Sequence, residues 1–313
     1  MAIVTAQMVK ELREMTLAGM GDCKKALDAA EGNMDKAVIV LREKGLANAA
    51  KKADRVASEG VVAVAVDSNN VGFVFEVNCE TDFVTKNEGF QSFVSNLQTL
   101  VLKNKPENLG SLLELPYDSS VSVKSAATSL VATIGENINV RRFGRVGSGK
   151  NFVGSYLHGG GKIGVLVELS GTGIENHLSN TTLLEISKDV ALQAAAMKPQ
   201  YLSENEIPAE VIKSEEDIIR NKFLKQGKPE AALAKIIPSS LKTWMKEVCL
   251  TEQLFVKDDS KSVATYVAES GKKLGINDLK INAFLSLELG QGVEKKVEDF
   301  AAEVAATVAA AKG

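Results

Sequence analysis

The sequence has few of the residues that build metal sites and disulfide frameworks. Its 313 residues include two histidines and three cysteines, and Cys23, Cys79 and Cys249 stand far apart with no CxxC pair. An odd number of separated cysteines cannot make a closed disulfide set, and two histidines leave an ordinary zinc site short of clustered ligands. We therefore expect reduced thiols, no metal site and no cofactor.

Long apolar runs and an excess of one charge are also missing. No stretch approaches the roughly 20 apolar residues of a membrane helix, and the first residues lack the basic start and apolar core of a secretory signal. The 37 basic and 40 acidic side chains give a formal charge of -3, so no strong basic field attracts a phosphate backbone. We expect a cytoplasmic protein whose partner is neither a membrane nor a nucleic acid.

The chain begins with apolar residues at helical spacing. Three short helices are predicted in the first 45 residues, because Thr5, Asp22 and Asn33 can each cap one. Gly45 is expected to end the third helix. The Ala-rich, charged stretch 47–60 has no wide apolar face, so we expect a solvated helical connector there.

The pattern then changes to the alternation of a strand, and the same pattern occurs twice. VGFVFEV at 71–77 is matched by IGVLVEL at 163–169, and each follows a hairpin turn and precedes a helix. Later, INAF at 281–284 matches VRRF at 140–143. Self-similarity in the same order of elements predicts a duplicated α+β unit. We expect antiparallel sheets, each covered on one face by helices.

Two further segments carry helical stripes. Residues 206–247 contain two apolar stripes separated by a turn at 226–229, which predicts an antiparallel helical hairpin. Such a hairpin either satisfies its own apolar surface or exposes a stripe for self-association or for a partner. The stripe of the last segment consists of Val293, Val297, Phe300, Val304 and Val308. Periodicity does not decide whether that helix packs on its own core or on a partner.

These patterns divide a globular chain into five parts. The composition, 45% hydrophobic and 25% charged, is that of a folded protein long enough for roughly two ordinary domains. The expected parts are a three-helix module with the start of its connector at 1–54, a first core subdomain at 55–145, a second core subdomain at 146–204 and 249–289, an inserted helical hairpin at 205–248, and a C-terminal helical module at 290–313.

Two stretches look like enzyme motifs and are interpreted otherwise. Residues 144–150 fit the start of the phosphate-binding pattern GxxxxGK[ST], but Asn151 replaces the Mg²⁺-binding hydroxyl and a strand-like stretch follows. We interpret this stretch as the turn of a hairpin. Cys79 could be a nucleophile with His158 as its base only if the fold joined them. Since Cys79 lies in an apolar strand, we expect a buried thiol there and no enzyme.

The two motifs that remain together resemble one family. LREMTLAGMGDCKKAL at 12–27 and EVNCETDFVTKN at 76–87 are similar to the two signature stretches of bacterial elongation factor Ts, the guanine-nucleotide exchange factor of elongation factor Tu. The resemblance covers the full length in order: a small helical domain similar to a ubiquitin-associated fold, a duplicated core, an inserted hairpin and a C-terminal helix. It implies that the partner is elongation factor Tu, either GDP-bound or free of nucleotide.

The resemblance also implies a set of contact residues. A turn at a strand end enters the partner's GTPase domain near its Mg²⁺, and a phenylalanine inserts between partner helices, so that Mg²⁺ and the phosphate loop are displaced and GTP can replace GDP. The residues that match this turn are Thr81, Asp82, Phe83 and Val84. The expected further partner contacts are Arg13, Met20 and His158. Where the family often has two consecutive methionines, Met20 is followed here by Gly21.

The residues alone leave two alternatives open. Phe83 could equally pack into its own core, and Asp82 could serve as a cap for the helix that starts near Asn87. At the level of function, the alternative is a protein-interaction scaffold without exchange activity, which would bind through the N-terminal helices and the inserted hairpin.

Overall fold

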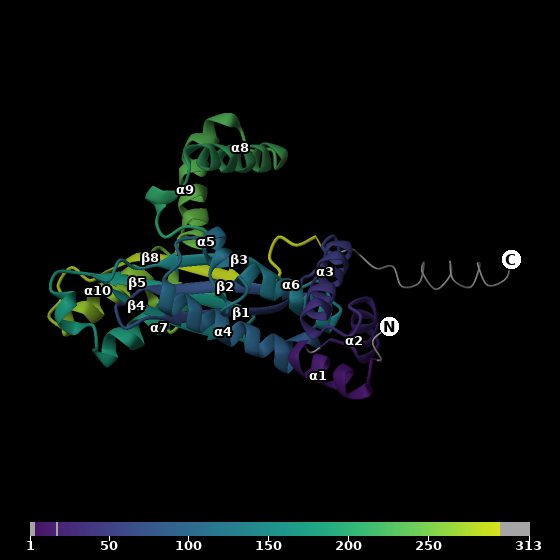
Figure 1. Ribbon diagram of the computed structural model, residues 1–313. Coiled ribbons are helices and arrows are strands. Elements are labelled where there is room, and N and C mark those ends of the chain that lie inside the picture. The colour runs from purple at the N-terminus through teal and green to yellow at the C-terminus, as the bar shows by residue number, and fades with distance from the viewer. Residues whose placement is uncertain (1–3, 17, 295–313) are drawn as a thin grey trace.

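Helices and antiparallel sheets together make up the fold, which confirms the predicted α+β class (Figure 1). The computed structural model describes residues 4–16 and 18–294. Three helices come first in this part of the chain: α1 (Ala6–Thr16), α2 (Met20–Ala29) and α3 (Met34–Lys52). Their shared core, which includes Leu12 and Leu27, is separate from the cores of the sheets.

The first sheet has the strand order β1-β2-β3, and each pair is antiparallel. Its strands are β1 (Glu59–Val66), β2 (Gly72–Cys79) and β3 (Asn139–Val146). The elements between β2 and β3 are the short 3-10 turn η1 (Val84–Lys86) and the helices α4 (Glu88–Asn104), α5 (Leu109–Glu114) and α6 (Val123–Ile134). Phe73, Phe75 and Val77 of β2 form one core with these helices. The helices therefore cover one face of this sheet.

The second sheet repeats this arrangement with the order β4-β5-β8. Its strands are β4 (Phe152–His158), β5 (Ile163–Ser170) and β8 (Lys280–Glu288). Between β5 and β8 lie η2 (Ile174–His177), α7 (Thr181–Met197), η3 (Glu204–Glu206), the inserted helices, the small hairpin of β6 (Leu254–Phe255) and β7 (Asp258–Ser262), and α10 (Val263–Lys273). The register shifts after Glu76 in β2 and after Glu168 in β5. The same strand order and the same site of irregularity agree with the predicted duplication.

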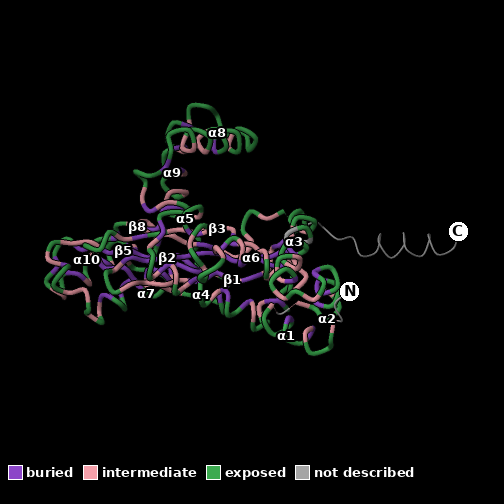
Figure 2. The backbone as a smooth tube through the Cα atoms, in the orientation of Figure 1, coloured by how far each residue is buried: buried purple, intermediate pink, exposed green. Residues whose placement is uncertain are grey.

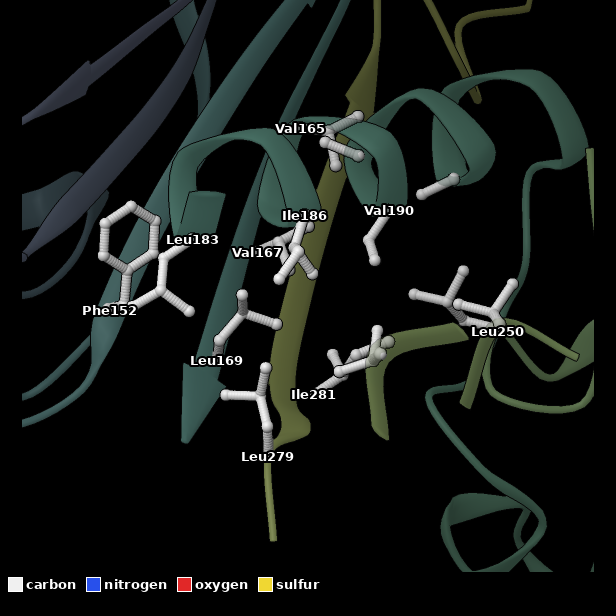
Figure 3. Packing of buried hydrophobic residues seen from close by; sticks show 14 of the residues in the cluster. Phe152, Val165, Val167, Leu169, Leu183, Ile186, Val190, Leu250, Leu279 and Ile281 are labelled. Atoms are coloured by element: carbon white, nitrogen blue, oxygen red, sulfur yellow. The ribbon is translucent and has the colours of Figure 1, made fainter. Parts of the chain in front are cut away.

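Each sheet has helices on one face and the other sheet on its second face. Figure 3 shows Val165 and Val167 of β5 meeting Ile186 and Val190 of α7. On the opposite face, a smaller cluster that includes Val74 and Leu166 joins the two sheets. Buried residues accordingly concentrate in the strands, and exposed ones in the outer helices (Figure 2). The central strands are buried on both faces because each lies between two layers.

The inserted hairpin projects from the sheets and consists of α8 (Ala209–Lys225) and α9 (Glu230–Val248) (Figure 1). Its two stripes bury against each other through Ile219, Leu233, Ile237 and Leu241. Ile218, the neighbour of Ile219, is instead 56% exposed, because adjacent helical residues point about 100° apart. The hairpin thus satisfies much of its own apolar surface, and self-association stays a prediction.

The third helix is longer than predicted, because Gly45 lies inside it. A Cβ at Gly45 would stand 3.1 Å from the Cβ of Ala132 on α6, so the glycine permits a close approach of two helices. Lys52 Nζ then donates to the carbonyl of Gly135, which caps α6, at 2.5 Å. The stretch from residue 47 is helical as far as Lys52 and exposed at most of its described positions, as expected, but Ala49 and Lys52 contact the first sheet's core and helices.

Two of the three predicted helix caps are present. Thr5 Oγ1 accepts from the N–H of Met8, and Asn33 Oδ1 accepts from the N–H of Lys36. Asp22 does not cap α2, which begins after Gly19. Its carboxylate lies in the first turn and pairs with Lys44 Nζ at 2.5 Å, so it favours the helix through charge instead.

The apolar stripe expected from Val297 to Val308 lies outside the described residues. The five-part domain division stays a prediction. Among residues 4–16 and 18–294, no helix has both the length and the apolar character needed to cross a bilayer.

Candidate functional site

The turn after β2 carries the most exposed large apolar side chain of the described residues. Phe83 is 77% exposed, whereas its neighbour Val84 is buried. The amides of Thr85 and Lys86 bond back to the carbonyls of Asp82 and Phe83 at 3.2 and 3.1 Å, which forms the 3-10 turn. The backbone of Phe83 is unstrained, with φ -61° and ψ -36°. The turn therefore anchors itself through Val84 and leaves the Phe83 ring outside.

Glu136 holds this turn from the segment that precedes β3. One of its oxygens accepts from the Thr81 N–H at 2.9 Å, and the other accepts from the Thr81 hydroxyl at 2.6 Å. Beneath the turn, the thiol of Cys79 donates to the carbonyl of Thr81 at 3.1 Å. Both polar groups of the Thr81 backbone are thus satisfied before the exposed residues begin.

Asp82 is exposed beside Phe83 and does not cap the helix that follows. The cap of α4 is Asn87, whose side-chain oxygen accepts from the amides of Gly89 and Phe90. The carbonyl of Asp82 accepts from the hydroxyl of Thr85 at 2.6 Å. The interpretation of Asp82 as a cap is therefore wrong, and its carboxylate faces solvent next to an aromatic ring.

Thr81, Asp82 and Phe83 line an open groove of about 540 Å³. The turn between β4 and β5 also lines the groove, through residues 159 and 160. This turn is fixed to the first sheet, because the N–H of Val62 donates to the carbonyl of Gly161 at 2.7 Å. Turns from the two halves of the core therefore meet at one groove.

His158 precedes this second turn and is exposed. Its Nδ1 lies 2.9 Å from the hydroxyl of Tyr156, and the two ring centroids are 5.9 Å apart. The three glycines that follow all have positive φ, which the tight hairpin requires. The glycines thus serve a hairpin between strands, and Tyr156 orients the imidazole.

The suspected pairing of Cys79 with His158 has no support in the geometry. Cys79 is fully buried, and its thiol donates to a backbone carbonyl. Burial, together with the nearby Glu136 carboxylate, raises the pKa of the Cys79 thiol to about 12. The nucleophilic form of cysteine is the thiolate, so Cys79 is inert at neutral pH.

Arg13 and Met20 lie on a different surface. Arg13 is in the last turn of α1, and Met20 begins α2 with 46% of its surface exposed. Neither residue lines the groove beside Phe83. Gly21 is also exposed, and a Cβ at this position would meet nothing within 4 Å. The N-terminal helices therefore offer a second exposed patch, separate from the groove.

The stretch that resembles a phosphate loop connects two sheets. It leaves β3 of the first sheet and enters β4 of the second, so the interpretation as a hairpin turn is wrong. Asn151 donates its side-chain amide to Glu168 at 2.9 Å. No helix begins there, and a phosphate loop needs a helix N-terminus. The glycines serve the crossing between the sheets.

The second half of the core contains a counterpart of the Thr81 turn that sequence reasoning missed. Thr172, which follows β5, donates its N–H and its hydroxyl to Asp278 at 2.8 and 2.7 Å. Gly173 comes next, and the buried Ile174 begins η2. Where the first half has Asp82 and Phe83 before its buried residue, the second half has a single glycine. An alignment of the two halves by their strands would have revealed this difference.

The family model and the curated relatives point to the same family. The family model described as Elongation factor TS matches residues 80–291. The elongation factor Ts of Clostridioides difficile (strain 630) is 47% identical over 306 residues, which cover 97% of this chain and 99% of the relative. That of a Nitratiruptor species is 49% identical over 308 residues, which cover 98% and 99% of the two chains.

Proposed function

This chain belongs to the elongation factor Ts family, and on that premise we propose that it binds elongation factor Tu and promotes release of GDP. The observation that carries the proposal is the exposure of Phe83 on a turn that is otherwise satisfied by hydrogen bonds. No covalent step is involved, and no cofactor is needed. The protein acts in the cytoplasm through a surface that binds its partner, and neither a nucleic acid nor a membrane takes part.

The Thr172 turn in the second half of the core supports a binding role for Phe83, because that turn forms without an aromatic residue. Thr172 and Asp278 form the same pair of hydrogen bonds around Gly173. An exposed phenylalanine is therefore not required to build the turn. Burial of such a side chain against another protein is worth about 1.5 to 3 kcal/mol. A ring on a short, satisfied turn also loses little conformational freedom when it binds.

We assign the residues of the turn different roles in the complex. Phe83 inserts between helices of the partner's GTPase domain, and Asp82 lies near its Mg²⁺. Val84 anchors the turn from inside this protein, since it is buried. Displacement of Mg²⁺ and of the phosphate loop removes charge neutralisation and amide donors from GDP. The nucleotide then leaves, and GTP can bind.

The other expected contacts act on separate surfaces. Arg13 and Met20 would bind through the N-terminal helices, and His158 would bind from the second turn that lines the groove. Coupling between ligands is reciprocal, so a protein that weakens GDP binding is itself held less tightly when GDP is present. The complex with the nucleotide-free partner is therefore the tighter one, and GTP binding ends the cycle.

The test follows GDP release from elongation factor Tu that carries a fluorescent GDP. The wild-type chain accelerates release, and Phe83→Ala lowers that acceleration about ten- to a hundredfold if the burial of the ring is lost. Leu254→Ala is the matched control, because Leu254 is 57% exposed on β6 and belongs to none of the assigned contacts. It should leave the rate unchanged.

Two results would refute the proposal. If the wild-type chain binds the partner without changing the rate of GDP release, the protein is an interaction scaffold. If Phe83→Ala matches the wild type while both are folded, the exchange mechanism does not run through this ring. Circular dichroism of each variant confirms that it is folded.

A further inference from the structure

We propose that Glu136 is a positioning residue for nucleotide exchange: its carboxylate fixes the Thr81 turn so that Phe83 meets the partner in one orientation. This inference rests on the proposed function. Glu136 acts through Thr81, without touching the nucleotide. It lies 55 residues away in the sequence, outside the motif that contains Phe83.

The geometry of the contact suits this role. A carboxylate that accepts from both the N–H and the hydroxyl of one threonine fixes that residue's backbone and its χ1 rotamer together. Phe83 is two residues further along the chain, so a change in the backbone direction at Thr81 directly changes the orientation of the Phe83 ring. The contact is exposed, and exposed charged contacts add little to global stability.

The segment that carries Glu136 is itself held on both sides. The carbonyl of Gly135 accepts from Lys52 Nζ. The side-chain amide of Asn137 donates to the carbonyls of Ala53 and Arg55 at 3.2 and 2.8 Å, while its backbone N–H donates to Glu80 Oε1 at 2.6 Å. Glu136 is therefore a fixed point between the end of α3 and the turn.

This segment also relates two of the proposed contact surfaces. Lys52 ends α3, which packs with the helices that bear Arg13 and Met20. Glu136 holds the turn that bears Phe83. A partner that touches both surfaces at once gains most when their relative position is fixed before binding, since less freedom is then lost.

The second half of the core provides an internal control, which shows how much such a contact contributes to stability alone. Asp278 holds Thr172 by the same two bonds, but its turn carries Gly173 and no exposed aromatic ring. Removal of either carboxylate breaks a similar pair of hydrogen bonds. Only the loss at Glu136 should reach the exchange activity.

The experiment measures GDP release and thermal unfolding for Glu136→Ala and Asp278→Ala. Freedom regained by one backbone residue corresponds to about 1 to 2 kcal/mol, so we expect Glu136→Ala to lower the acceleration of GDP release about tenfold. Asp278→Ala should keep the wild-type exchange rate, whatever its change in melting temperature. Glu136→Gln, which keeps one acceptor, should fall between the wild type and Glu136→Ala and also serves if the alanine variant does not fold.

A double-mutant cycle separates positioning from direct contact. In the Phe83→Ala background the ring is absent, so Glu136→Ala should change the rate less than about twofold. Additive losses, or equal losses for Glu136→Ala and Asp278→Ala, would overturn the inference. If Phe83→Ala slows exchange but Glu136→Ala and Glu136→Gln do not, this inference alone fails. If Phe83→Ala has no effect, the proposed function itself fails.

Discussion

Glu76 on β2 and Glu168 on β5 occupy matching positions on the two central strands, each directly before a register shift. Both side chains lie on the face that meets the other sheet, alternating with the apolar residues that join the sheets. Their partners differ in charge. Glu76 receives two guanidinium groups, whereas Glu168 receives two side-chain amides. The duplicated fold therefore holds a buried ion cluster in one half and a hydrogen-bonded cluster in the other.

The two glutamates should respond differently to the loss of charge. Glu76→Gln leaves Arg141 and Arg142 without their carboxylate, from which Arg142 Nε lies 2.5 Å, and an unpaired, partly buried charge costs about 3 kcal/mol or more. Glu168→Gln can still bond to Asn151 and should lose only about 1 kcal/mol. Urea unfolding of both variants measures the difference. Equal losses of unfolding free energy would show that the two guanidinium groups become hydrated without an energetic penalty when the carboxylate is removed.

Two helical glycines should give opposite results on replacement. Gly21→Ala should raise the free energy of unfolding by up to about 1 kcal/mol, because alanine favours the helix and its Cβ meets nothing within 4 Å. Gly45→Val should lower it by about 1 to 3 kcal/mol, since the Cβ would stand 3.1 Å from that of Ala132. Thermal unfolding followed by circular dichroism compares them. A higher free energy of unfolding for both variants would show that the contact between α3 and α6 accommodates a larger side chain without strain.

Gly21 also allows a gain of function to be tested. Gly21→Met places a second methionine next to Met20 on an exposed helix start, which is the pair that the family resemblance leads us to expect. If this patch contacts elongation factor Tu, the added flexible apolar side chain should strengthen binding several-fold, on the order of 1 kcal/mol. Isothermal titration with the nucleotide-free partner measures it. Gly21→Ala separates side-chain contact from helix propensity, and equal affinities for the two variants would argue against the contact.

The elements that sequence reasoning predicted are those with strong local periodicity. The alternation in β2 and β5 and the helical stripes of α4 and α7 gave the duplicated core, because each pattern directly reflects two-sided burial. Gly45 gave a wrong helix end, since its role depends on Ala132, which is distant in sequence. The loop from β3 to β4 differs from the predicted hairpin turn for a similar reason. Nothing local tells whether two successive strands share a sheet.

Only part of the candidate site can be predicted from the sequence. The motif around Phe83 predicts a turn at the end of β2, but the exposure of the ring depends on Val84 taking the inward position of a 3-10 turn. Glu136 gave no signal, because it follows a helix of the same subdomain and looks like an ordinary surface residue. Its meaning appears only when the Thr81 and Thr172 turns are compared in three dimensions.

Cys79 should make the protein less stable at high pH. Burial, with a contribution from Glu136, raises the pKa of its thiol from 9.0 to about 12, so above pH 9 the unfolded chain releases this proton while the folded chain retains it. The unfolded state then binds fewer protons, and the free energy of unfolding falls as the pH rises from about 9 to 12. Cys79→Ala removes this contribution, so urea unfolding at pH 8, 9.5 and 10.5 should show a shallower decline than the wild type. Parallel curves would contradict it. Because the thiol donates to the carbonyl of Thr81, its ionisation would also loosen the turn that presents Phe83.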